Sequence, residues 1–317
     1  MGRVIAQGWE AVTDLEVPSW NWLSGDITDA YCSNKTDHVS RSYLVWVWPA
    51  ENSNSDDSAS AGSSTAVIVL DRVHSTDPSF KKTFLMHTLN KPKAVSRIGE
   101  TAATGFEITA GDGALSGTML LPASVSVATV GGPGNEFEAG GKNWPPAKPS
   151  SGVSGQWRLE VSPTKAQEYL LRTISIQILQ WSFRSIHCMC IARSRYDLFI
   201  SAWQPHDTNT AAAPAATLVS WPEAVVVGVQ VRERLAVFVA APAGMANVTS
   251  LDLRGGKDVD WGDTQTVTLH ACGLQAGAWV AVGGKALGTV AAPSFCLVAN
   301  VTEPDLEAGP LACVVAL

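Results

Sequence analysis

The chain has 317 residues, of which 46% are hydrophobic and 16% are charged, and its formal net charge is -7 at pH 7. This composition supports a hydrophobic core and excludes a disordered chain. The acidic balance, without clusters of Lys and Arg, excludes a nucleic-acid-binding surface. Since no apolar run approaches the roughly 20 residues that cross a bilayer, and the first residues lack a signal-peptide pattern, we expect no membrane anchor and no signal peptide in this chain.

The elements predicted from the sequence are short strands, because Gly, Pro, Ser, Thr and Val are frequent and long charged helices are not. In the run "RSYLVWVWP", Tyr43, Val45 and Val47 alternate with Leu44, Trp46 and Trp48, which predicts a strand that is apolar on both faces. The polar, low-complexity residues 50–64 predict a loop. Regular strand and turn patterns then fill residues 65–162 and return from residue 217 onward.

Residues 172–199 differ from the rest of the chain. They contain no Gly or Pro, and Ile is frequent where the other segments use Val. We expect this segment to be an insertion of low order, either helical or disordered, and its sequence is compatible with a retained intron. The predicted organisation is a lead-in at 1–24, a first part of a β-sandwich at 25–171, the insertion at 172–199, and the remainder of the sandwich at 200–317.

Five blocks carry a resemblance to a known family: "SGDITDAY", "VIVLDRVHSTDPSFKKTFLMHTLNKP", "GDGALSGTMLLP", "VGGPGNEFEAGGKNWP" and "WRLEVSP". In this order they resemble the C-terminal β-sandwich of the heparinase II/III-like polysaccharide lyases. The resemblance covers about half of the chain and implies an all-β, antiparallel supersandwich-like fold. It also implies the secretory route or an extracellular location, and a uronic-acid glycan as the substrate of the full-length enzymes.

The same resemblance implies that the chain is incomplete as an enzyme. In the full-length family an α/α toroid supplies part of the catalytic cleft, and the first strands supply a His-x-His pair and metal ligands. No histidine precedes Gly25. We therefore expect a lyase sandwich that is inactive alone, contacts acidic polysaccharide weakly, partners a separate or missing toroid, and needs no cofactor of its own. The alternatives are a stand-alone carbohydrate-binding or cell-surface adhesion module, and a compact lyase with clustered Tyr, His and Arg.

Two residues are weak catalytic candidates. His87 lies in "TFLMHTL", where alternation places it on the face of Leu85 and Leu89, and it is expected to be a structural histidine with satisfied partners rather than a base or a metal ligand. Tyr31, near Asp26 and Asp29, is the other candidate for a polar group that faces substrate.

Candidates for substrate binding are exposed aromatic rings and arginines. Trp20, Trp22 and Trp144 lie in turn-like sequence beside prolines, where rings that stack on sugars are expected, although edge packing in a sandwich is the alternative. Arg41 and Arg158 are candidates for contacts with an anionic glycan.

The remaining motifs are weaker indicators of function. The glycine-rich "GGPGNEFEAGG" predicts a loop rather than a phosphate site, and "GDGALSG" predicts a tight hairpin turn. The "HCMC" at 187–190 lies in the expected insertion, and no metal site is predicted. The pairing of the six cysteines is left open, and N-x-S/T sequons begin at Asn34, Asn247 and Asn300.

Overall fold

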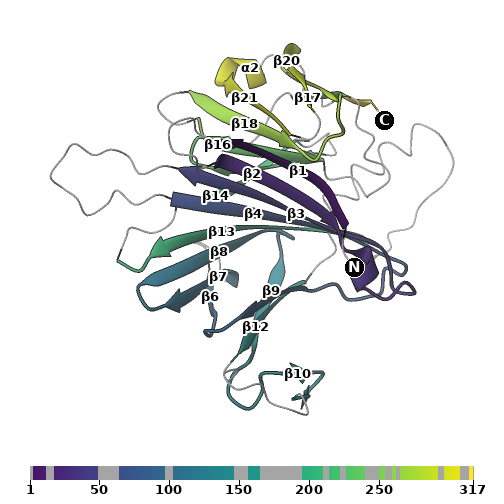
Figure 1. The fold of residues 1–317 in the computed structure, drawn as a ribbon, viewed down its shortest axis with the longest axis vertical. Coiled ribbons are helices and arrows are strands. Elements are labelled where there is room, and N and C mark those ends of the chain that lie inside the picture. The colour runs from purple at the N-terminus through teal and green to yellow at the C-terminus, as the bar shows by residue number, and fades with distance from the viewer. Residues whose placement is uncertain are drawn as a thin grey trace.

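The computed structural model describes residues 3–11, 18–48, 64–96, 103–145, 156–164, 195–209, 214–221, 226–239, 250–253, 259–261, 265–291, 296–307 and 314–316. Nearly all of them lie in β-strands or in the turns that join strands (Figure 1). The predicted all-β, sandwich-like fold is confirmed. The polar loop 50–64 and the "HCMC" motif lie outside the described residues, apart from Ser64, which begins a strand.

An eight-stranded antiparallel sheet is the largest element, with the strand order β1-β2-β3-β4-β13-β8-β7-β6. Its strands are β1 (Arg3–Ala11), β2 (Pro18–Asp26), β3 (Thr36–Trp48), β4 (Ser64–Ser75), β13 (Tyr196–Asp207), β8 (Gly113–Leu121), β7 (Ala103–Ala110) and β6 (Lys93–Ser96). The short 3-10 helix η1 (Thr28–Ala30) connects β2 to β3.

Four smaller sheets complete the fold. The three-stranded sheet contains β5 (Phe84–Thr88), β12 (Trp157–Pro163) and β9 (Val125–Gly131), and the hairpin contains β10 (Glu138–Ala139) and β11 (Lys142–Asn143). The five-stranded sheet contains β14 (Ala216–Ser220), β15 (Val226–Val231), β16 (Arg234–Val239), β18 (Thr266–Cys272) and β21 (Cys296–Thr302). The four-stranded sheet contains β20 (Lys285–Thr289), β19 (Trp279–Val282), β17 (Ser250–Leu253) and β22 (Val314–Ala316), and the helix α2 (Glu303–Glu307) follows β21.

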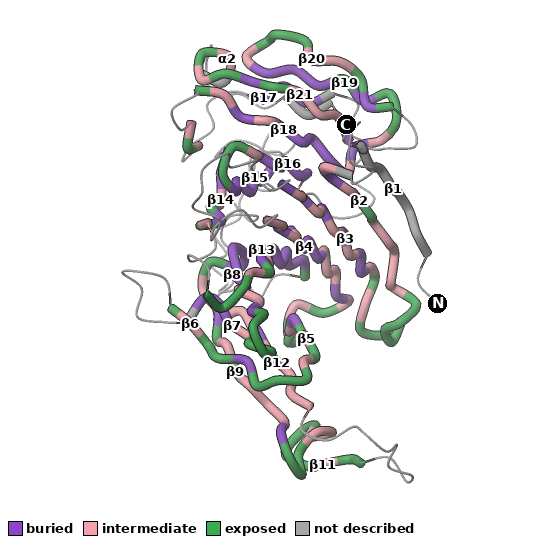
Figure 2. Tube along the Cα trace, turned by 60° about the vertical axis from the view of Figure 1, so that its left-hand side comes forward, coloured by how far each residue is buried: buried purple, intermediate pink, exposed green. Residues whose placement is uncertain are grey.

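Three hydrophobic cores hold four sheets in a stack. The tryptophan core lies between the eight-stranded and five-stranded sheets and includes Trp20, Trp22, Trp46, Trp48, Ile68, Ile200, Val229 and Phe238. The valine core lies between the five-stranded and four-stranded sheets and includes Val237, Leu251, Leu253, Val267, Val280 and Val301. The outer core lies between the eight-stranded and three-stranded sheets and includes Phe84, Phe106, Met119, Leu159, Val161 and Phe199. Figure 2 shows the buried strands in the middle of this stack and the exposed β10–β11 hairpin at its lower tip.

Alternation along the central strands explains the stack. In β13, Leu198 and Ile200 belong to the tryptophan core, and Phe199 between them belongs to the outer core. Successive side chains of a strand point to opposite faces, so a strand between two layers must be apolar on both. The same rule accounts for β3, where Leu44 and Trp46 are buried while Val45 and Val47 are half-buried on the other face.

The structure adds strands to the expected lead-in and moves one boundary of the expected insertion. The lead-in 1–24 contains β1 and most of β2, which pair with each other at one edge of the eight-stranded sheet. Residues 196–199, expected at the end of a disordered or helical insertion, begin β13 and are buried at the centre of that sheet; 172–194 lie outside the described residues. Among the described strand pairings, β16/β18 and β17/β19 are parallel and the others are antiparallel.

The hairpin predicted at "GDGALSG" is confirmed. Ala110 pairs with Gly113, and the two residues between them connect β7 to β8. Gly111 has φ of 61°. A positive φ at the first central residue suits glycine and is the arrangement of type II′ turns, whose twist matches that of the strands.

Candidate functional site

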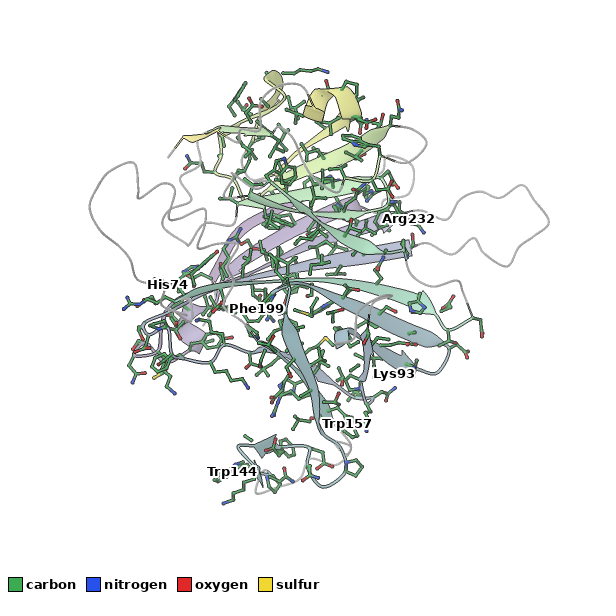
Figure 3. The ribbon with its side chains drawn as sticks, turned by 180° about the vertical axis from the view of Figure 1, so that it is seen from behind. His74, Lys93, Trp144, Trp157, Phe199 and Arg232 are labelled. Atoms are coloured by element: carbon green, nitrogen blue, oxygen red, sulfur yellow. A yellow bond between two sulfur atoms is a disulfide. The ribbon has the colours of Figure 1, made fainter. Side chains whose placement is uncertain are left out.

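One end of the eight-stranded sheet concentrates polar and titratable side chains. The end of β2, the start of β3, the end of β4 and the start of β13 meet there, beside η1. On the face toward the five-stranded sheet, cross-strand register places His38 opposite His74 and His74 opposite Tyr196. Ser40 is likewise opposite both Asp26 and Arg72. We call Asp26, His38, Arg72, His74 and Tyr196 the His-Tyr-Arg cluster; Figure 3 labels His74 at this end of the sheet.

Within the cluster Tyr196 is buried and Arg72 is half-buried, and their side chains are hydrogen-bonded to each other. Arg72 Nη2 also donates to the carbonyl oxygen of Val239, 2.8 Å away on the five-stranded sheet. Burial raises the pKa of Tyr196 to about 12, and burial lowers the pKa of Arg72 from its usual value. At neutral pH Tyr196 is therefore a phenol that can donate a proton but cannot accept one.

The two histidines are more accessible. His74 Nδ1 lies 3.6 Å from Asp37 Oδ2, and both side chains are partly exposed. Burial lowers the pKa of His38, with smaller opposing and assisting effects from the charges of Asp26 and Arg72. The lowered pKa keeps His38 neutral near pH 7, which is the form that accepts a proton. Its buried Nε2 has no hydrogen-bond partner among the described residues.

The Asp26 carboxylate is held by the turn that follows it. The backbone N–H and the hydroxyl of Thr28 donate to Asp26 Oδ1 at 2.9 and 2.6 Å. The Thr28 hydroxyl also accepts from the backbone N–H of Val39 at 2.9 Å. These bonds tie η1 to the start of β3 and position the carboxylate near His38.

The opposite face of the same strand ends carries two ion pairs. Arg41 is bidentate to Asp71, with Nε and Nη2 each 2.6 Å from a carboxylate oxygen. Lys82 Nζ lies 2.7 Å from Asp197 Oδ2, with both side chains almost fully buried. Burial raises the pKa of both carboxyls, and the partner cations oppose that shift. Arg41 is therefore engaged by Asp71, and its contact with a glycan stays a prediction.

The tryptophans at the start of the chain are not exposed. Trp20 and Trp22 retain 5% and 1% of their accessible surface, and both belong to the tryptophan core. Register explains this, since Trp20 is opposite Trp46 and Trp22 is opposite Leu44, and all four side chains point at the five-stranded sheet. The prediction that these two rings stack on sugars is therefore wrong, and the alternative of packing in the sandwich holds.

Trp144 differs, because 59% of its surface is exposed. It follows the β10–β11 hairpin, with Lys142 Nζ 4.0 Å from the centre of its ring and its own Nε1 donating to the Ala139 carbonyl at 3.3 Å. Arg158 on β12 anchors this hairpin by donating from Nη1 to the Glu138 carbonyl at 2.8 Å. A second pair, Lys91 and Trp157, lies on the neighbouring sheet with Nζ 4.9 Å from the ring centre.

Arg158 itself is not free to bind substrate. Its Nε and Nη2 donate to Glu160 Oε1 at 2.8 and 2.6 Å, and its side chain is largely buried. The prediction that Arg158 contacts glycan directly is wrong; it holds the hairpin that presents Trp144 (Figure 3).

The two weak catalytic candidates, His87 and Tyr31, lie at different sheets of the fold and are both exposed. His87 is exposed on β5, on the face of exposed Leu85 as alternation predicts, while Phe84 enters the outer core. It has no hydrogen-bond partner among the described residues, so the expectation of a satisfied structural histidine is wrong. Tyr31 follows η1 at the polar end of the eight-stranded sheet and is 51% exposed.

Two further observations bear on chemistry. Cys272 and Cys296, directly opposite each other on β18 and β21, form a disulfide, which settles one pairing left open by the sequence. Within the described part of the chain, no three His, Cys, Asp or Glu side chains are arranged to hold a metal ion. None of the helices in those same ranges is long and apolar enough to span a membrane.

Sequence reasoning missed His38, His74 and Tyr196. A signal was present, because "TDHVS" directly precedes the strand predicted at "RSYLVWVWP" and His74 follows the apolar run of the next one, and antiparallel neighbours bring such ends together. Tyr196 was assigned to the insertion and so was not considered. A scan against protein-family models finds no match for this chain, and a comparison with curated proteins finds no significant relative.

Proposed function

We propose that the chain is the β-sandwich part of a heparinase II/III-like polysaccharide lyase, which contributes one wall of a site for uronic-acid glycans and is inactive alone. The observation that carries this proposal is the His-Tyr-Arg cluster. β-Elimination needs a group that neutralises the substrate carboxylate, a base for the adjacent proton and an acid for the leaving oxygen. Arg72, neutral His38 and the Tyr196 phenol are the residue types for those three roles.

Burial is the reason to expect no activity from the chain alone. Tyr196 retains 4% of its accessible surface, and the half-buried Arg72 has its Nη2 bonded to the backbone carbonyl of Val239. A polymeric substrate needs these groups on an open surface, aligned with its reacting atoms. The more accessible members, His74 and its neighbour Asp37, cannot supply the carboxylate-neutralising group. A second structural element, such as the toroid of the family, would have to complete the site.

The test has two arms on the purified full chain. Titration calorimetry with heparan sulfate, alginate and ulvan at low salt is expected to detect weak binding that declines as salt is raised, with dextran as the uncharged control. Ultraviolet absorbance of the unsaturated product is expected to stay flat. Absence of binding to every acidic glycan would overturn the glycan relationship. Steady product formation that is lost in His38→Ala or Tyr196→Phe would instead show a compact lyase.

A second candidate function, a stand-alone carbohydrate-binding or cell-surface adhesion module, is favoured by Trp144. Its exposed indole, with a lysine ammonium against the ring, combines a stacking surface with a positive charge that suits an acidic sugar. One comparison of variants distinguishes the two candidate functions. Loss of glycan binding in Trp144→Ala with no effect of His74→Ala favours the module, and the reverse favours the lyase wall.

A further inference from the structure

Asn34, in the connection between η1 and β3, begins the sequon Asn34-Lys35-Thr36 and lies fully on the surface. We propose that Asn34 carries an N-linked oligosaccharide. Its side-chain amide makes no hydrogen bond with any described residue, so its substitution would disrupt no contact in that part of the fold. This inference does not rest on the lyase relationship proposed above.

The backbone around Asn34 is held although its side chain is not. The Thr76 hydroxyl donates to the Asn34 carbonyl at 2.9 Å, and the backbone N–H of Thr76 donates to the Lys35 carbonyl at 3.1 Å. The Lys35 N–H in turn closes a turn onto the Cys32 carbonyl at 2.9 Å. The turn therefore presents the amide to solvent at a fixed point of the surface, beside the start of a strand.

The chemistry requires a transferable sugar and an accessible amide nitrogen. Asn34 Nδ2 forms a bond to C1 of an oligosaccharide linked to a lipid pyrophosphate, loses one proton, and the lipid pyrophosphate leaves. A transferase reads the hydroxyl two residues later, which here belongs to Thr36. The transfer of the oligosaccharide to Asn34 Nδ2 changes no oxidation state and so needs no oxidant.

The disulfide is the independent observation that favours the compartment in which this transfer occurs. Cys272 and Cys296 are bonded between adjacent strands, with Cys272 fully buried. Stable structural disulfides form in oxidising compartments such as the lumen of the endoplasmic reticulum, which is also where N-linked sugars are added. In a eukaryotic cell, a chain that forms this disulfide in the endoplasmic reticulum also meets the enzymes that add N-linked sugars.

The sequon at Asn300 provides an internal comparison. Asn300 is also exposed, but it lies within the edge strand β21, and its Oδ1 accepts a hydrogen bond from the Thr268 hydroxyl at 3.0 Å. Glycan on that side chain would have to accommodate both the strand pairing and this bond. Asn34 has neither constraint, and the proposal is confined to it.

The experiment is a peptide-level mass measurement on the full chain, directed into the secretory route of eukaryotic cells by an added cleavable signal peptide. Removal of N-glycans by an amidase in ¹⁸O-labelled water converts a glycosylated Asn34 to ¹⁸O-labelled aspartate, and this label is expected in most Asn34 peptides. Thr36→Ala should abolish the label, and Thr36→Ser, which keeps the sequon, should retain it. Because peptides are read, a variant that folds poorly is still informative.

Unlabelled Asn34 in the secreted wild-type chain would overturn the proposal, as would an unchanged label in Thr36→Ala. The same digest applied to the chain isolated from the cells that naturally express it is expected to show the same labelled peptide. An unmodified Asn34 peptide there would also overturn the proposal, whatever the binding and lyase assays show.

Discussion

The tryptophan core and the β10–β11 hairpin place the same residue type in opposite environments. Trp22 and Trp46 are enclosed between two sheets, with 1% and 0% of their surfaces exposed, whereas Trp144 extends from the tip of the molecule. Residues beside Trp20 and Trp144 look alike in sequence, since both tryptophans lie next to or near a proline. A tryptophan is buried where a second sheet covers its strand and exposed where none does. Whether a second sheet covers the strand depends on contacts between segments that are distant in the sequence.

Removing a ring from the core is the strongest way to test this contrast. Trp46→Ala leaves a large cavity between the eight-stranded and five-stranded sheets and is expected to lower the free energy of unfolding by about 3–5 kcal/mol. Since whole domains are stable by only about 5–15 kcal/mol, part of the chain should unfold at room temperature. Urea denaturation followed by tryptophan fluorescence and far-ultraviolet circular dichroism measures the change. Trp144→Ala is the matched control, and equal losses in the two variants would contradict the assignment of core and surface.

The contrast between buried and exposed positions also holds for two lysines. Lys82 is paired with Asp197 and buried beneath the outer core, whereas Lys142 is exposed against Trp144. Lys82→Met leaves the Asp197 carboxylate buried without its cation, and we expect a loss of about 3 kcal/mol in the free energy of unfolding. Lys142→Met should change stability by less than about 0.5 kcal/mol. The double variant Lys82→Met with Asp197→Leu should recover most of the loss, and failure to recover it would mean that Lys82 acts through packing rather than charge.

A buried histidine, His270, gives a further test of the core. His270 on β18 lies between Trp20 and Trp46, 5.8 and 5.4 Å from their ring centres, and neither of its ring nitrogens has a hydrogen-bond partner among the described residues. Burial first, and the charge of Arg234 second, lower its pKa to about 3. The unfolded chain, with a histidine pKa near 6.5, therefore takes up a proton before the folded chain does. The stability that neutral His270 supports is complete above about pH 6.5 and is lost as the pH falls toward 3.

This linkage predicts a specific difference between variants. Between pH 6.5 and pH 5 the wild-type chain should lose about 1.5 kcal/mol more stability than His270→Leu, because only the wild type carries this linkage. Denaturation midpoints at several pH values measure the difference, and taking the difference cancels the contribution of the carboxylates. Parallel slopes in wild type and His270→Leu would mean that folding does not lower the pKa of His270 and would contradict its burial as a neutral side chain.

More of the fold than of the candidate site could be predicted from the sequence. Alternation in "YLVWVW" gives β3 and its two faces, and the turn at Gly111 follows from local backbone preferences, because both depend on neighbours in the chain. The number of layers does not follow locally, and the two arginines assigned to substrate are in fact used by Asp71 and Glu160. Residues 196–199 look foreign for a related reason. Their side chains are buried on both faces of β13, and a strand covered on both faces lacks the apolar-polar alternation that marks an ordinary strand.

Trp144→Ala is expected to have the smallest effect on stability and the clearest effect on glycan binding. Trp144→Ala removes an exposed ring from the hairpin that Arg158 anchors, so the free energy of unfolding should change by less than about 0.5 kcal/mol. If that ring stacks on acidic glycan, its loss should weaken binding roughly twofold to tenfold, in line with the 0.5–1.5 kcal/mol typical of aromatic contacts. Lys142→Met should keep the stacking surface and reduce only the salt-dependent part of the affinity. Calorimetric titration at two salt concentrations separates these contributions, and unaltered affinity in both variants would remove the hairpin from any account of glycan binding.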